Sequence, residues 1–214
     1  MGATFTPATS LVSQVERYLD PTMREAHTLL EMIMSRTPTL SDKLPPRRDL
    51  WGEPVVLQGG MGWDFVSPIY SSLIKDDPVA IEMAEQEMGF SMPSRKIDSG
   101  KFATEMTNEE FDDYVVLVGK KLKMDFVTDN GDYKELNLHD YIGAFMKTQD
   151  YKGLTDGPDG MKSNMVLGII SQFKTTARKL MLYEDSEYFN EGLFKRWKAN
   201  QDKERYIQEK KIQD

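Results

Sequence analysis

The sequence of 214 residues contains no cysteine and only two histidines. Without cysteine the chain has no disulfide, no thiolate zinc site and no cysteine nucleophile. His27 and His139 lie far apart, and neither is followed by the second His or Glu that a metalloprotease motif requires at helical spacing. We therefore interpret both as satisfied or surface histidines, and we expect no metal and no cofactor.

Long apolar runs and an excess of basic charge are also missing. No hydrophobic run approaches the roughly 20 residues of a spanning helix, so we expect no membrane span. Residues Met1–Ser10 lack the basic and apolar regions of a secretory signal, which favours a protein of the cytoplasm or of a particle made there. Lys and Arg number 27 against 35 Asp and Glu, and the net charge of -8 repels phosphate, so strong nucleic-acid binding is not expected.

What the sequence does contain is helical periodicity with clear start signals. Asp-Pro pairs at Asp20-Pro21 and Asp77-Pro78 are typical of a helix cap followed by its first turn. Thr107–Glu110 has the pattern of a capping box, and Asn137 is a further N-cap. The strongest predicted helix has an apolar stripe at helical spacing, made of Met161, Met165, Ile169, Phe173, Ala177 and Leu180.

These signals predict a mainly α fold with long irregular Pro/Gly-rich connecting segments and extended terminal arms. We divide the chain into an N-terminal arm (1–19), a mainly helical domain (20–197) and a charged C-terminal tail (198–214). The stretch Phe90–Met106 is expected to be irregular, as is 38–72, which holds five prolines and four glycines.

The segment 38–72 is unusually aromatic for a connecting loop. Four of its side chains are too apolar for a free linker, so we expect them to anchor it on the helical body or on a neighbouring subunit, as partner-binding residues: Trp51, Trp63, Phe65 and Tyr70. Arg47 and Arg48 follow two prolines in the same segment. They are either a solvated pair that bonds to local acids, or a rigid presentation of two guanidinium groups to a partner.

No motif assembles into a recognisable active site. The densest acidic cluster, which comprises Glu109, Glu110, Asp112 and Asp113, lies in the first turns of a predicted helix, where capping explains it better than glycosidase chemistry. Asp129–Asp132 lacks the register of a calcium loop, so we predict a turn. We expect a protein that is not an enzyme; the alternatives are a carboxylate-based hydrolase and an acidic module that binds a host protein.

Three segments follow one another along the chain: Leu44–Pro54, Ser67–Tyr70 and Lys75–Val79. In sequence and in order they resemble the C-terminal region of very large bacteriophage internal virion proteins, the polyvalent or DNA-ejection proteins. Met92–Ile97 resembles the family's Pro-x-Arg-Lys-Ile element, and Met106–Tyr114 resembles its Leu-Thr-x-Glu-Glu-Tyr-Asp-x-Tyr helix start. The similarity spans roughly Asp20 to Leu182.

The resemblance implies a virion component in the capsid interior or near the portal and tail, in contact with other phage virion proteins and present as a homo-oligomer or multi-copy assembly. It implies either structural function or delivery with the DNA. In the family this region commonly ends a giant chain whose enzymatic modules lie elsewhere, so a free-standing or a split chain is expected here. No catalytic residue is carried over.

Overall fold

The computed structural model describes residues 44–55, 77–89, 91–98 and 101–213. This part of the chain is mainly helical, which confirms the predicted class. The helices are α3 (Pro78–Glu85), α4 (Asn108–Val116) with a π-helical turn η4 (Leu117–Lys121), α5 (Leu138–Lys147), α6 (Gln149–Lys152), α7 (Met161–Leu182) and α8 (Glu191–Gln213). The arm 1–19 and the first predicted helix, with His27, lie outside the described residues.

Three helices begin at the predicted caps. The Asp77 carboxylate accepts from the backbone N–H of Val79 at the start of α3. Thr107 and Glu110 form both hydrogen bonds of the capping box that starts α4. Asn137 accepts from the Asp140 N–H at the start of α5. Each cap satisfies backbone donors that have no partner inside the helix, so these starts are fixed by local sequence.

Two antiparallel hairpins were not predicted. β1 (Lys96–Ile97) pairs with β2 (Thr104–Glu105) inside the stretch expected to be irregular. β3 (Met124–Val127) pairs with β4 (Tyr133–Leu136), and the turn predicted at Asp129–Asp132 connects them. An Asn-Gly pair between two short alternating segments is a hairpin signal, so Asn130-Gly131 was the clue to the second hairpin.

The buried face of α7 differs from the predicted stripe. Met161 and Met165 are 54% and 48% exposed, so their assignment to the apolar face was wrong. Steps of four residues turn a helix by about 40° too much each, which places Met161 about 120° from Phe173. The face that is buried consists of Ser163, Val166, Ile170, Phe173, Ala177 and Met181.

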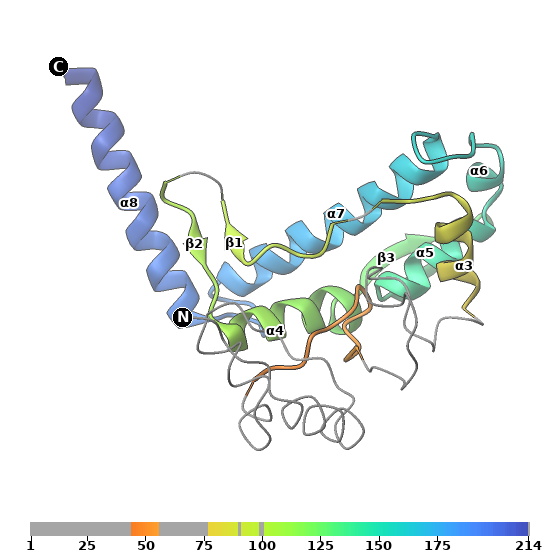
Figure 1. The fold of residues 1–214 in the computed structure, drawn as a ribbon, viewed down its shortest axis with the longest axis horizontal. Coiled ribbons are helices and arrows are strands. Elements are labelled where there is room, and N and C mark those ends of the chain that lie inside the picture. Colours follow the sequence, from red (N-terminus) through yellow and green to blue (C-terminus); the bar gives the residue numbers. More distant parts are fainter. Residues whose placement is uncertain (1–43, 56–76, 90, 99–100, 214) are drawn as a thin grey trace, which may run out of the picture.

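The core lies where α7 packs against α4, η4 and α5. Its most deeply buried large side chains include Tyr114, Phe173, Leu138, Ile142 and Ile170. α3 packs on α5, and α6 follows α5 directly. Figure 1 shows α7 running along this body, with α8 leaving the end of α7 at a steep angle beside the β1–β2 hairpin. Across the described segments, no helix combines the length and the hydrophobicity needed to cross a bilayer.

Helix α8 begins in the body and then extends past it (Figure 1). Leu193 is fully buried, and Trp197 donates to the Asp98 carboxylate at 2.8 Å. Gln201 bonds the same carboxylate at 2.9 Å and is the last residue of α8 to hydrogen-bond another described element. The helix continues without a break through residue 197, where the charged tail was expected to separate from the domain.

Candidate functional site

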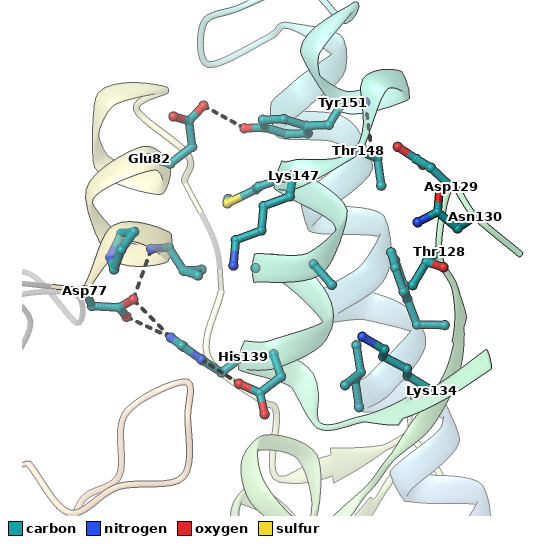
Figure 2. Close-up of a pocket in the computed structure, with 18 residues that line it drawn as sticks. Asp77, Glu82, Thr128, Asp129, Asn130, Lys134, His139, Lys147, Thr148 and Tyr151 are labelled. Atoms are coloured by element: carbon teal, nitrogen blue, oxygen red, sulfur yellow. Dashed lines mark hydrogen bonds and ion pairs between the residues drawn. The ribbon is translucent and has the colours of Figure 1, made fainter. Parts of the chain in front are cut away.

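A groove of about 710 Å³ lies between α3, α5 and the β3–β4 hairpin (Figure 2). One stripe of α5 contributes Asp140, Gly143, Ala144 and Lys147 to its lining. A Cβ on Gly143 would lie 3.1 Å from Val79 Cγ2, so the glycine lets α3 approach α5 closely. The small residues in the middle of the stripe leave open space between the two flanking elements.

Strand register decides which hairpin side chains line the groove. Phe126 is paired with Lys134, and Leu136 lies two residues farther along the same face of β4; all three line the groove. The Phe126 ring meets the Tyr141 ring edge to face, with centroids 5.0 Å apart, and this contact holds Phe126 on the α5 side. The opposite face of the hairpin carries the exposed cross-strand pair Val127 and Tyr133.

One end of the groove holds a histidine between two carboxylates. His139 Nε2 lies 3.0 and 3.1 Å from the two Asp77 oxygens, and Nδ1 lies 3.4 Å from Asp140 Oδ1. Its ring also meets the edge of Trp51, with centroids 4.9 Å apart. Both ring nitrogens therefore face carboxylates of the same chain. The interpretation of His139 as a satisfied histidine is confirmed.

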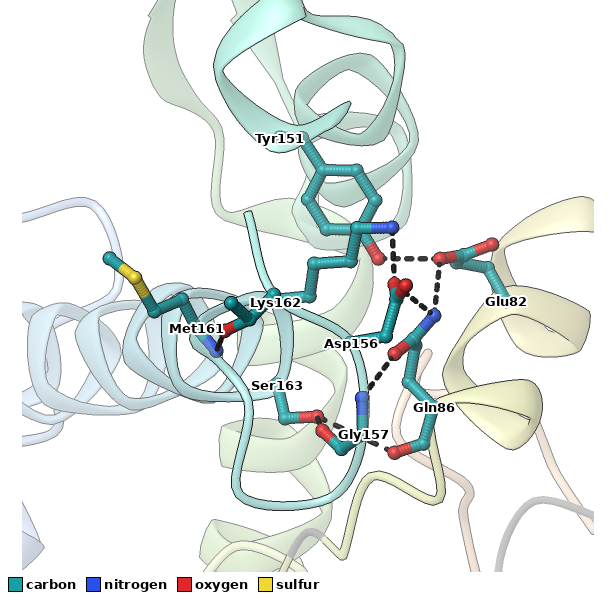
Figure 3. A network of polar contacts seen from close by, with 9 residues as sticks. Glu82, Gln86, Tyr151, Asp156, Gly157, Met161, Lys162 and Ser163 are labelled. Atoms are coloured by element: carbon teal, nitrogen blue, oxygen red, sulfur yellow. Dashed lines mark hydrogen bonds and ion pairs between the residues drawn. The ribbon is translucent and has the colours of Figure 1, made fainter. Parts of the chain in front are cut away.

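The other end of the groove is built on a polar network (Figure 3). Tyr151 donates its hydroxyl proton to Glu82 at 2.8 Å. Burial, and then the hydrogen bond to Glu82, raise the pKa of Tyr151 well above its ordinary value. A phenol with a raised pKa stays protonated and serves as a fixed donor, so this tyrosine joins α6 to α3 and does not act as a base.

Gln86 connects α3 to the loop before α7. Its Nε2 donates to Glu82 at 3.2 Å and to Asp156 at 3.0 Å, and its Oε1 accepts from the Gly157 N–H at 2.8 Å. Lys162 donates to Asp156 at 2.6 Å, and this hydrogen bond is the main cause of the lowered pKa of Asp156. All hydrogen-bonding groups of the Gln86 amide are therefore used inside the fold, which fixes how α3 is oriented on α7.

The acidic cluster of α4 is also used within the chain. Glu110 closes the capping box and forms an ion pair with Arg196 of α8. Asp112 receives two hydrogen bonds from Arg48, from Nε at 2.5 Å and from Nη2 at 3.0 Å. Glu110 thus has the capping role that was predicted, and both carboxylates bind arginines of the same chain, whereas a glycosidase needs carboxylates that face a substrate.

The two arginines of the proline-rich segment have different environments. Arg48 is partly buried, and its Nη1 also donates to the Gly52 carbonyl at 2.9 Å; the hydrogen bond to Asp112 raises the pKa of Arg48. Arg47 is exposed. Trp51 is half-buried and packs against the core and His139. Of the residues predicted to bind a partner, Arg48 forms hydrogen bonds and Trp51 packs within the same chain. Trp63, Phe65 and Tyr70 lie outside the described residues.

The backbone of the segment around Trp51 packs directly against the backbone of the π-helical turn η4 at Gly119. A Cβ on Gly119 would lie 2.3 Å from the Trp51 carbonyl carbon and 2.6 Å from the Gly52 nitrogen, which no side chain tolerates. Gly52 has a φ of +77°, a conformation that glycine adopts readily. No sequence pattern indicates this contact, because the residues that Gly119 meets lie more than 60 positions away along the chain.

Within the described residues, no cluster of three or more His, Cys, Asp or Glu could hold a metal ion. Comparison of the chain with known protein families, with curated proteins and with solved structures finds no match in any of the three.

Proposed function

We propose that the chain is a non-catalytic, multi-copy component of a bacteriophage particle that works through protein–protein contacts. The observation that carries this proposal is helix α8, whose last three turns extend beyond the described body (Figure 1). A polar helix of this length has little stability in water without packing against something else. A second protein surface would provide that packing.

The outer part of α8 exposes two large apolar side chains. Tyr206 is 66% exposed and Ile207 is 38% exposed, and they lie five and six residues beyond the last hydrogen bond to the body. Tyrosine is enriched at protein interfaces because it buries a large area at low entropic cost. Tyr206 and Ile207 are therefore the apolar centre of the contact that we propose.

Charge favours another copy of the chain as one partner of α8. The helix carries seven basic and four acidic residues, whereas the whole chain has a net charge of -8. A basic helix on an acidic protein is attracted to the acidic surface of a second copy, and such attraction orients the encounter. A contact between unlike surfaces is heterologous, and it closes into a ring or extends into a filament.

The groove supports the non-catalytic part of the proposal. His139, Tyr151 and Glu82 resemble catalytic groups in type, but each has its hydrogen-bonding partner inside the fold. A catalytic base or nucleophile has to face the reacting atom within hydrogen-bond distance. The resemblance of Leu44–Pro54 and the later motifs to phage internal virion proteins supports a place in the capsid interior or near the portal and tail.

Sedimentation velocity of the full chain over a range of concentrations tests the assembly. We expect oligomers that weaken at high salt, because the contact includes opposite charges. Tyr206→Ser with Ile207→Ser should raise the dissociation constant about tenfold or more, since interface aromatics dominate binding. Tyr133→Ser is the matched control, because Tyr133 is 77% exposed on β4 and far from α8 in the sequence. A monomer at every concentration contradicts the proposal, as does equal behaviour of the two variants.

A further inference from the structure

The charged groups of the groove are divided into those with partners and those without. Four carboxylates line it, and each accepts a hydrogen bond within the chain: Asp77, Glu82, Asp129 and Asp140. The side-chain ammonium groups of the two lysines that line it, Lys134 and Lys147, form no hydrogen bond or ion pair with any residue that the structure describes. In Figure 2 the Lys147 side chain extends from α5 toward α3, and Lys134 extends from the hairpin toward the groove.

The remainder of the lining is largely apolar. Phe126 and Leu136 lie on the hairpin side, Val79 lies on α3, and Ala144 and Met146 lie on α5. A volume of about 710 Å³ falls within the range of about 300–1,000 Å³ that is usual for small-ligand sites. The groove thus combines an apolar surface with two cations that have no partner.

We propose that this groove binds a small amphipathic monoanion, a carboxylate attached to an apolar chain or ring. The apolar body would lie along the small residues of α5, against Phe126, and the carboxylate would bond to Lys134 or Lys147. This inference goes beyond the assembly role and stands separately from it.

The groove's charges also exclude neighbouring ligand classes. A cationic amphiphile would meet the two ammonium groups, which have no side-chain partner, whereas the carboxylates already accept hydrogen bonds within the chain. A polyphosphate would bring more negative charge beside the four carboxylates than the two lysines can offset, whereas a monoanion needs only one of the lysines. A small hydrophilic anion would bury no apolar area and would gain only a solvent-exposed ion pair.

Chemical shift titration by NMR tests the proposal with three probes: octanoate, acetate and octylammonium. We expect octanoate to shift the amide signals of α5 and of the β3–β4 hairpin in a saturable way. Acetate and octylammonium should bind at least tenfold more weakly, because each lacks one of the two required features. Equal binding of octanoate and octylammonium, or no saturation with octanoate, overturns the proposal.

Variants identify the groups responsible. Lys134→Gln or Lys147→Gln should each weaken octanoate binding, the one that contacts the carboxylate by about fivefold, as expected for one exposed charge pair. Lys123→Gln removes an exposed lysine that does not line the groove and should change nothing. Ala144→Leu keeps both lysines, fills the floor and should abolish binding while thermal melting stays two-state. Octanoate affinity that is unchanged in both groove lysine variants overturns the assignment.

Discussion

The attachment of the Pro-Pro-Arg-Arg segment gives the sharpest stability prediction, because two adjacent arginines have opposite environments. Arg48 donates to both oxygens of Asp112 and to the Gly52 carbonyl. Arg47 is exposed. Arg48→Ala should therefore destabilise the fold, whereas Arg47→Ala, which makes the same chemical change one residue away, should not.

The magnitude follows from the geometry. The side chains of Arg48 and Asp112 are 17% and 23% exposed, between the surface and the buried limits. A hydrogen bond to a charged group contributes about 1.5–3 kcal/mol when it is buried, and an exposed ion pair contributes below about 1 kcal/mol. The three hydrogen bonds of Arg48, at this intermediate exposure, should together contribute about 2–3 kcal/mol to the free energy of unfolding. For a chain of 214 residues, this corresponds to a fall in Tm of about 5–10 °C.

Thermal melting by circular dichroism, together with urea unfolding, measures the effect. Arg47→Ala should stay within about 0.5 kcal/mol of the parent protein. Asp112→Ala should destabilise about as much as Arg48→Ala, and the double variant should lose much less than the sum of the two, because they remove one shared interaction. Equal melting of the Arg47 and Arg48 variants would refute the reasoning, and so would full additivity between Arg48 and Asp112.

Three further predictions concern backbone contact, pH and metal. Gly119→Ala should cost about 3 kcal/mol in urea unfolding, because its Cβ meets the Trp51 backbone, whereas Gly168→Ala, which meets nothing within 4 Å, should stabilise by about 0.5–1 kcal/mol; equal effects would contradict this backbone contact. Burial raises the pKa of Asp49 while its Oδ1 accepts from the Trp51 and Glu53 amides. The contribution of Asp49 to stability is therefore complete below about pH 3.9, the ordinary carboxyl value, and is lost as pH rises through the raised pKa. Asp49→Asn should accordingly melt higher than the parent at pH 7 and equally at pH 3; a variant less stable at pH 7 would contradict this. Elemental analysis after dialysis should find no stoichiometric zinc or calcium, and about one ion per chain would contradict that expectation.

Helix starts were predictable because their physics is local. A cap joins a side chain to a backbone amide two or three residues away. The sequence around Asp77, Thr107 and Asn137 was therefore enough to predict where these three helices begin. The turn at Asp129–Asp132 was predictable for the same reason. The mainly α class follows from several such starts, each followed by helical periodicity.

The groove and the hydrogen bonds between Arg48 and Asp112 were not predictable, because they join residues that are distant in the sequence. His139 meets Asp77 across 62 residues, and Arg48 meets Asp112 across 64. No local sequence pattern indicates which carboxylate each of these side chains contacts. The same holds for Gly119, which has to be a glycine because the backbone of Trp51 occupies the space of a side chain. The predicted face of α7 was wrong because it followed large apolar residues at steps of four and left out Ser163. This serine is buried, and its hydroxyl donates to the Gly157 carbonyl.

The most direct test of the proposed function is quantitative mass spectrometry of phage particles purified from a lysate whose DNA contains the coding sequence of this chain, before and after genome release. A multi-copy virion component should be found in intact particles at a fixed ratio to the major capsid protein. Loss of the chain after release would assign it to ejection, and retention would assign it to the particle structure. Absence of the chain from intact particles, when it is abundant in the infected cell, would contradict the proposal.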